Sequence, residues 1–213
     1  MACPALVRTV ALAFTSALPA GQSPLVKKSV DFRNFTFAFP RGELSAAPSK
    51  MTWMSLNVQN TVALVNGRYD FDKAKPSAGP SVILDRVLYG YLTSATQLDA
   101  VVVLGYHTGG TANWKYVYAF SLASDQPRLI GWFGAGSRAD SGLYNVEVGN
   151  RSLTVDLLDS ARRIADCCSA GFVRTYYDFR EGHFVQRGPP EFGAVEESKP
   201  ASESKRIQQR PTH

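Results

Sequence analysis

A mainly β fold built from antiparallel hairpins is predicted by three features of this 213-residue sequence. Apolar and polar residues alternate along several segments, turn-forming residues separate those segments, and signals for the start of a helix are few. A period of two places successive side chains on opposite faces of a strand. We therefore expect a single domain of about eight to ten antiparallel strands with little helix, and an α+β arrangement is the alternative.

Three segments carry the alternation most clearly. Residues 35–39 place a phenylalanine at every second position, residues 114–122 do the same with mostly aromatic side chains, and residues 153–157 do so with aliphatic ones. Residues 100–104 are instead continuously apolar and rich in valine. Such a run is typical of a central strand that is covered on both faces.

Turn residues separate these strands. Gly149 and Asn150 predict a two-residue hairpin connection, because glycine tolerates positive φ. Residues 180–182 predict a slightly longer hairpin with a bulge, and residues 124–127 predict a further reversal. Helix signals are few, and the clearest lies in residues 160–165, where a serine cap predicts a turn or two of helix.

The start of the chain is typical of an export signal. Arg8 supplies positive charge, residues 10–14 form an apolar run, and residues 17–20 end in a small residue. We interpret residues 1–20 as a signal peptide and expect the mature protein in the periplasm or outside the cell. A buried first strand or helix is the alternative. No other stretch reaches about 18 consecutive apolar residues, so no membrane span is predicted in the mature chain.

Residues 21–187 are predicted to form one β-rich domain, because a segment of this length supports one hydrophobic core. Residues 188–213 contain prolines and mixed charges with few apolar residues, and this composition predicts a disordered tail. The net charge is +5, but the basic residues that produce it are scattered among acidic residues along the chain. Nucleic-acid binding is therefore not expected, since it requires a concentrated basic surface.

Cys167 and Cys168 are adjacent, and the only other cysteine, Cys3, would leave with the signal peptide. Thiols tend to pair in an oxidising compartment. Neighbouring Cα atoms lie about 3.8 Å apart, whereas ordinary disulfides span about 4.4–6.8 Å, so a bond between neighbours stores strain and is labile. We therefore take Cys167 and Cys168 as a disulfide candidate. Because such a bond is labile, a redox role is one hypothesis for the protein. Buried or free thiols, a metal site and an intermolecular bond are the alternatives.

The richest loop follows the valine strand. It contains His107, Gly109 and Gly110, and successive glycines leave backbone amides available to an anion or a sugar hydroxyl. The alternative is a hairpin loop in which the glycines serve geometry alone. We take these three residues as binding candidates, together with Arg138 and Asp140 from a second loop. Those two side chains are also expected to fix their own turn by an ion pair or hydrogen bonds.

A hydrolase would require His107 to act with Asp140 or Ser141. The G-x-S-x-G turn that exposes a catalytic serine is absent, and the chain has three histidines in all. The loop before the valine strand retains one carboxylate, Asp99, which is too few for a calcium site. No catalytic residue, metal or cofactor is therefore predicted.

Four segments carry a resemblance when they are taken together. They are VDFRNFT at residues 30–36, AVVVL at 100–104 followed by TGG at 108–110, RADSGL at 138–143, and DCCSAGFVRT at 166–175. Their order and spacing resemble a group of uncharacterised, exported bacterial proteins. Relatives in that group carry D-x-T/D-G-D-G before the valine strand, where this chain has YLTSAT at 91–96. The resemblance implies export and a β-rich domain, with no established activity.

These observations together predict a noncatalytic protein of the cell envelope that binds a ligand or has a structural role. The sequence assigns no ligand and no partner, so both are taken as unknown. Two alternatives from other classes are kept, namely a hydrolase that uses His107 with Asp140 or Ser141, and a redox-responsive protein that uses Cys167 and Cys168.

Overall fold

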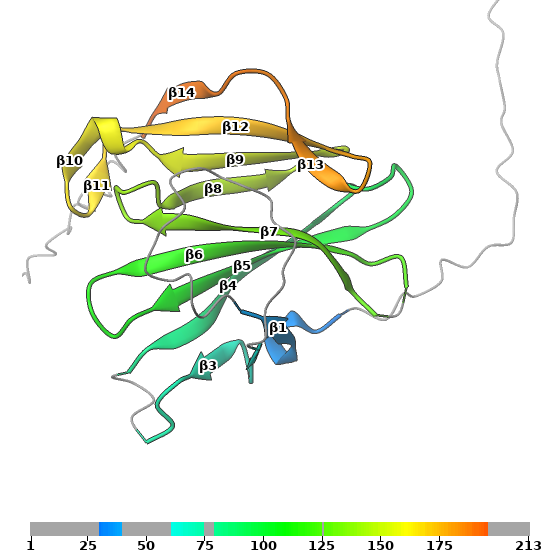
Figure 1. Ribbon diagram of the computed structural model, residues 1–213, viewed down its shortest axis with the longest axis horizontal. Coiled ribbons are helices and arrows are strands. Elements are labelled where there is room, and N and C mark those ends of the chain that lie inside the picture. The colour runs from blue at the N-terminus through cyan, green and yellow to red at the C-terminus, as the bar shows by residue number, and fades with distance from the viewer. Residues whose placement is uncertain (1–29, 40–60, 75–78, 125, 196–213) are drawn as a thin grey trace, which may run out of the picture.

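The computed structural model describes residues 30–39, 61–74, 79–124 and 126–195, which form fourteen strands and two short 3₁₀-helices. All pairings between these strands are antiparallel (Figure 1). The prediction of a mainly β fold is thus confirmed. The expected signal peptide, residues 1–20, lies outside the described residues.

The central sheet has five strands in sequence order, each paired with the next. They are β3 (Arg68–Asp70), β4 (Ser81–Gly90), β5 (Asp99–His107), β6 (Asn113–Ser121) and β7 (Arg128–Ser137). Each connection is a hairpin, as the alternation and the turn residues predicted.

The second sheet is organised around its longest strand, β12, which pairs with β9 on one side and with both β13 and β14 on the other. β8 pairs with the outer side of β9. The bounds are β8 (Leu143–Val148), β9 (Ser152–Leu158), β12 (Gly171–Arg180), β13 (His183–Gln186) and β14 (Glu191–Ala194).

A third, small layer lies on the other side of the central sheet (Figure 1). It consists of the 3₁₀-helix η1 (Phe32–Asn34) and the paired strands β1 (Thr36–Ala38) and β2 (Thr61–Ala63). Asp31 starts η1 by accepting a hydrogen bond from the Arg33 amide, 3.0 Å away. Phe32 and Phe37 of this layer are almost completely buried against the central sheet.

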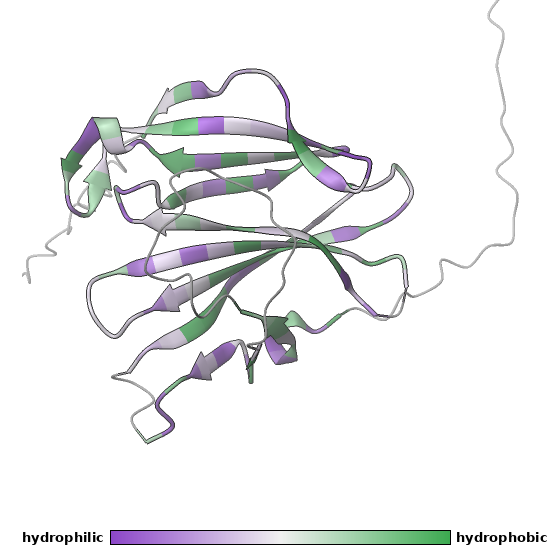
Figure 2. Cartoon of the chain, viewed as in Figure 1, coloured by the Kyte–Doolittle hydropathy of each residue, from purple (hydrophilic) through white to green (hydrophobic). Residues whose placement is uncertain are grey.

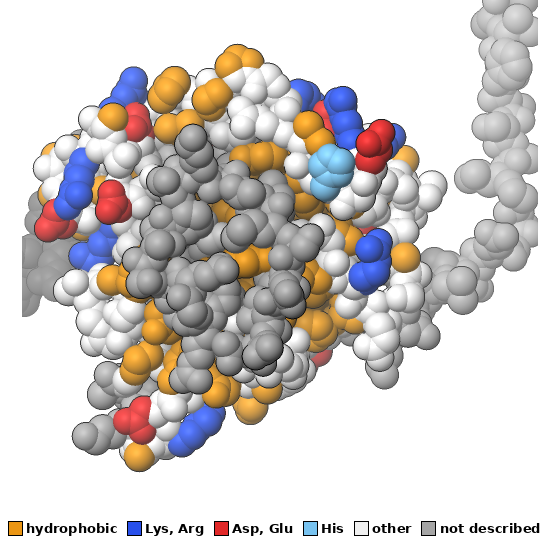
Figure 3. Space-filling view, viewed as in Figure 1, with side chains coloured by type: hydrophobic (Ala, Val, Ile, Leu, Met, Phe, Trp, Pro, Cys, Tyr) orange, Lys and Arg blue, Asp and Glu red, His pale blue; other side chains and the backbone are white. Residues whose placement is uncertain are grey.

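The central sheet therefore packs against a layer on each face, and in Figure 2 hydrophobic stretches alternate with paler and hydrophilic ones along its strands. One face packs aromatic rings of β6 against the small layer, and the other packs Val101, Val103 and Val117 against the second sheet. Residues 100–104 are completely buried, as predicted for a central strand. On the face shown in Figure 3, hydrophobic side chains are visible between and around the grey atoms, and charged ones lie toward the margins.

The turns differ in detail from the predicted ones. Arg180 pairs directly with His183, so Glu181 and Gly182, both with positive φ, form a two-residue turn without a bulge. In the β8–β9 hairpin the positive φ falls on Arg151, and Gly149 instead closes the turn by donating its amide hydrogen to the Ser152 carbonyl. A side chain on Gly149 would collide with Ser152, so close approach is the reason for glycine there.

Two further predictions are corrected at the end of the second sheet. The predicted helix is one 3₁₀ turn, η2 (Ser160–Arg162), which is capped by Asp159 and is followed by the short strands β10 (Arg163–Ala165) and β11 (Cys168–Ser169). The tail predicted to be disordered from residue 188 includes β14, whose residues pair with the first half of β12. Backbone pairing, which composition does not report, orders this segment. Residues 196–213 lie outside the described part.

Because Tyr177 is buried, we expect the stability of the folded state to decrease at alkaline pH. Its side chain packs between the sheets, and desolvation raises the pKa of its phenol to about 12. The folded state then holds a proton that the unfolded state releases near pH 10, so this contribution to stability is complete below about pH 10 and is lost as the pH rises toward 12.

We expect the free energy of unfolding, measured with denaturant at a series of pH values, to fall between about pH 10 and 12. Tyr177→Phe should make that fall shallower, whereas Tyr144→Phe, at a position that is 41% exposed, should leave it unchanged. An identical slope in wild type and Tyr177→Phe contradicts the assignment. Some slope should persist in Tyr177→Phe, because burial also raises the pKa of Tyr118.

Candidate binding site

The register of the central sheet places polar residues in two rows at one end of one face. Asp70, Ser81, His107 and Asn113 are direct partners across β3, β4, β5 and β6. The next row inward contains Arg68, Ile83, Gly105 and Lys115. Directly opposed residues on neighbouring strands point to the same face, so both rows line one surface.

The third row marks the edge of the core. It contains Val103 and Val117, which are buried between the two sheets. The two polar rows therefore occupy the part of the face that extends beyond the second sheet. They border an open hollow of about 500 Å³, hereafter the β3–β6 hollow. It is lined by Arg68, Gly79, Ser81, Ile83, His107, Gly109, Gly110 and Asn113.

Gly105 lies next to the β3–β6 hollow, because it is the register partner of Ile83, which lines it. A Cβ atom at this position would lie 3.2 Å from Lys115 Nζ and 3.4 Å from His107 Nε2, so both side chains extend over the glycine. Gly105 is buried, and its missing side chain leaves room for the ends of these two side chains. Gly105 has no positive φ, so space and not backbone conformation is what glycine provides here.

Both cations of the second row are paired with carboxylates. Arg68 forms a bidentate contact with Asp70, at 2.9 and 3.0 Å from Nε to the two carboxylate oxygens. The hydrogen bonds from Arg68 hold the pKa of Asp70 below its usual value. Lys115 Nζ lies 3.1 Å from Asp85 Oδ1. The charges around the hollow therefore largely cancel.

Three neutral polar side chains of the first row remain available. The side chains of Ser81, His107 and Asn113 make no hydrogen bond to any other residue in the described part of the chain, although Ser81 is only 3% exposed. Each offers both a donor and an acceptor when the imidazole is neutral. Unpaired groups of this kind at an open hollow are available to a ligand.

The glycine-rich loop borders the hollow (green, at the left of Figure 1). Thr108 shapes it by donating from its hydroxyl to the Ala112 carbonyl and accepting from the Gly110 amide, at 3.0 and 3.3 Å. Gly109 has φ of +83°, a conformation that other residues rarely adopt. His107, Gly109 and Gly110 are thus brought together.

Arg138 and Asp140 do not line this hollow, and both are exposed. The expected ion pair between them is not among the contacts of the described residues. Backbone hydrogen bonds fix the turn instead, from Asp140 to Ser137 and from Gly142 to Arg138. Side chains on Gly136 or Gly142 would collide with the backbone of this loop.

The residues required for hydrolysis are not assembled around His107. Neither Asp140 nor Ser141 lines the β3–β6 hollow, and no hydrogen bond joins either of them to the imidazole. Ser81 is the hydroxyl residue directly opposite His107, but its Oγ forms no hydrogen bond with the imidazole. Within the described ranges, no three His, Cys, Asp or Glu side chains gather as a metal site would require.

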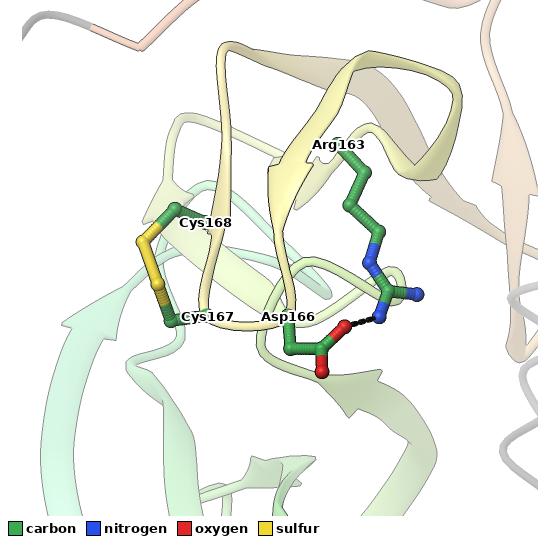
Figure 4. The surroundings of a disulfide bond; sticks show 4 residues. All are labelled: Arg163, Asp166, Cys167 and Cys168. Carbon is green, nitrogen blue, oxygen red and sulfur yellow. Dashed lines mark hydrogen bonds and ion pairs between the residues drawn. A yellow bond between two sulfur atoms is a disulfide. The ribbon is translucent and has the colours of Figure 1, made fainter.

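The cysteine pair lies at the tip of the β10–β11 hairpin, far along the chain from the hollow (Figure 4). The sulfurs of Cys167 and Cys168 are at bonding distance, and both residues are exposed. An ion pair between Arg163 and Asp166 spans one side of the hairpin. At the base, Ser169 Oγ donates to the Asp159 carbonyl over 2.7 Å and anchors the hairpin to the second sheet.

The sequence analysis missed Ser81, Asn113, Arg68 and Gly105. Each is an ordinary polar or small residue on a different strand, and only the strand register brings them to one surface. The available signal was the polar character of the strand ends next to His107. That signal identifies the end of the sheet but not which partners lie opposite.

Comparisons with family models, with curated proteins and with solved structures find no match to this chain. The resemblance to exported bacterial proteins therefore remains a hypothesis. The architecture defines the class of the molecule as an antiparallel β-sandwich with a small third layer. No helix within the described residues has the length and apolar character needed to cross a membrane.

Proposed function

We propose that this chain is an exported, noncatalytic β-sandwich that binds a polar ligand in the β3–β6 hollow, in the periplasm or outside the cell. The observation that carries the proposal is the convergence of Ser81, His107 and Asn113, unpaired, on one open surface. Export is supported by the signal-like residues 1–20 and by the resemblance to exported bacterial proteins.

A binding role is favoured over hydrolysis because the hollow supplies donors and acceptors without a catalytic arrangement. Acyl transfer by a serine needs a base hydrogen-bonded to the nucleophile and a carboxylate that orients the base. Here the nearest carboxylate of the first row, Asp70, is held by Arg68, and Ser81 lies between it and His107. Binding requires only that the polar groups face one ligand.

A thermal-shift screen of the full exported chain against glycans, peptidoglycan fragments and peptides tests this proposal. We expect at least one class to raise the unfolding temperature by a few degrees, because a ligand that binds only the folded state stabilises it. The shift should be lost in His107→Ala and in Asn113→Ala, since both side chains line the hollow.

Asn150→Ala is the matched control, because Asn150 lines a separate hollow of about 290 Å³ with Arg151, Asp178, Phe179 and Arg180. Its shift should equal that of the wild type. A shift that survives both substitutions in the β3–β6 hollow but disappears in Asn150→Ala contradicts the proposed site. Absence of stabilisation by all three ligand classes contradicts the binding role.

A redox-responsive role is a second candidate, favoured by the exposed position of the paired sulfurs at a hairpin tip. Reduction by a dithiol such as dithiothreitol would transfer two electrons and two protons to the bond, giving two thiols and the cyclic disulfide of the reagent. Both cysteines are exposed to solvent, so the reagent can reach the sulfurs without unfolding of the domain.

We expect thiol titration of the native protein to detect no free thiol before mild reduction and both thiols after it, with the unfolding temperature retained. Mass spectrometry of the peptide that holds Cys167 and Cys168 should show the loss of two hydrogens in the unreduced form. Cys167→Ser is the control, since it leaves one thiol that titrates under both conditions. Free thiols in the unreduced native protein contradict the redox role.

A further inference from the structure

We propose that the ligand of the β3–β6 hollow is a neutral saccharide. This inference rests on the proposed binding function and specifies its ligand class. Three observations support it: the balance of charge, the chemistry of the unpaired side chains and the apolar side chain of Ile83 in the lining.

The charges exclude the simplest alternative, which is an anion. A strong anion site needs uncompensated positive charge or several convergent amides. Both cations of the second row already contact a carboxylate, Arg68 with Asp70 and Lys115 with Asp85. An anion would therefore meet a carboxylate next to each cation, and the repulsion would offset the attraction.

The unpaired groups match hydroxyls. A sugar hydroxyl both donates and accepts, and a serine hydroxyl, an imidazole in its neutral form and a side-chain amide, the groups of Ser81, His107 and Asn113, each do the same. Because these three residues are direct partners across adjacent strands, their side chains are spaced by about 5 Å along a line. A row of this kind can hydrogen-bond successive hydroxyls of one ring or of two linked rings.

The lining of the hollow supplies the apolar contact that a sugar ring also requires. Among the residues of the described part, Ile83 is the only aliphatic side chain that lines the hollow. The C–H face of a pyranose can lie on Ile83 while its hydroxyls reach the first row. The volume of about 500 Å³ falls within the range of small-molecule sites.

The test measures backbone amide signals of Gly105, Gly109 and Gly110 by nuclear magnetic resonance in the full exported chain. The neutral probes are glucose, galactose, N-acetylglucosamine, maltose and cellobiose, and the anionic probes are inorganic phosphate and sulfate. We expect at least one neutral saccharide to shift these signals in a saturable way and the two anions to leave them unchanged.

Gly105→Val should abolish the saccharide-dependent shifts, because its side chain would displace the His107 imidazole, whose Nε2 lies 3.4 Å from a Cβ at this position. The clash is limited to the mobile ends of Lys115 and His107, so the fold should survive, as the unfolding temperature would verify. Asn113→Ala should weaken binding about tenfold, the loss expected for one or two hydrogen bonds. Asn145→Ala, on β8 outside the hollow, is the matched control and should bind normally.

The outcomes separate this inference from the proposed function. Saturable shifts with phosphate or sulfate and none with the sugars overturn the saccharide assignment but preserve binding in the hollow. Saccharide shifts that persist in Gly105→Val place the sugar elsewhere and also overturn the assignment. If no probe shifts these signals while a peptide stabilises the chain in the His107-dependent screen, the ligand class is wrong and the site is retained.

Discussion

Asp99→Ala is expected to lower the free energy of unfolding by about 3–5 kcal/mol, the range that follows from stranding several buried donors. The Asp99 carboxylate has no exposed surface, and it accepts hydrogen bonds from the amides of Leu92 and Thr93 at 2.8 and 2.7 Å. The Thr93 hydroxyl and the Gln97 side-chain amide also donate to it, at 2.9 and 3.3 Å.

The size of this effect follows from what the carboxylate holds in place. It ties the loop of residues 91–98 to the start of β5, and Leu92 of this loop is completely buried between the two sheets. Removal of the acceptor leaves the buried amide of Leu92 and the partly buried amide of Thr93 without a partner, and it releases Leu92 from the core. Both losses add to the cost.

Denaturant unfolding monitored by circular dichroism measures the prediction. Asp99→Asn keeps one acceptor oxygen and should lose less stability than Asp99→Ala, which also provides a measurable variant if the alanine protein does not fold. Asp85→Ala is the control, because that carboxylate is 41% exposed and an exposed ion pair contributes at most about 1 kcal/mol. Equal losses for Asp99→Ala and Asp85→Ala contradict the role assigned to Asp99.

Period-two patterns identified the strands of this protein because burial of one face controls side-chain polarity. The valine run at 100–104 and the aromatic strand at 114–122 are where the pattern placed them, since each packs against a layer of the core. The prediction of about eight to ten strands was too low. The additional strands, such as β10 and β11, are two or three residues long and are defined by pairing, which leaves no periodic signal.

The candidate site was predicted only in part for a related reason. Glycines next to a histidine are recognisable in one stretch of sequence, and His107, Gly109 and Gly110 do border the hollow. Ser81 and Arg68 belong to it through register with β5 and β4, which depends on how the hairpins align. Arg138 was grouped with His107 by residue type, yet the turn that holds it directs it to solvent.

Asp99 illustrates the same limit from the opposite direction. A single carboxylate before a strand does not indicate a metal site. In the structure the oxygens of Asp99 accept hydrogen bonds from donors of the protein. Its role depends on amides that only the folded loop presents. Sequence chemistry identifies what a residue can do, whereas burial and partners decide which of these roles it performs.

Arg174→Ala is expected to destabilise the second sheet by about 3 kcal/mol, because it leaves the buried Asp156 carboxylate uncompensated. Asp156 on β9 has a side chain that is 2% exposed, and its register partner Arg174 on β12 is bidentate with it at 2.8 Å for both contacts. These hydrogen bonds raise the pKa of Arg174 above its usual value.

The pair also organises the outer face of this sheet. The Arg174 guanidinium lies 5.3 Å from the centre of the Phe172 ring, and that ring stacks on Tyr144 of β8 at 5.2 Å. The stack therefore connects β12 to β8 across β9. Because Arg174 covers one side of Phe172, Arg174→Ala should destabilise through lost packing as well as through the stranded carboxylate.

A double-mutant cycle separates these contributions. Arg174→Ala should cost about 3 kcal/mol, and Asp156→Ala should cost less, because the Arg174 side chain is 33% exposed and keeps its contact with solvent. The double variant should cost clearly less than the sum of the two, because removal of both charges leaves neither stranded. Asp156→Leu with Arg174→Met should recover most of the stability, since apolar side chains of similar size fill the same space.

Arg180→Ala, which breaks an exposed pair with Asp178, is the control and should cost under about 1 kcal/mol. Additive losses in the cycle would show that the two strands are held by the aromatic stack and backbone pairing, with no coupling between the two charges.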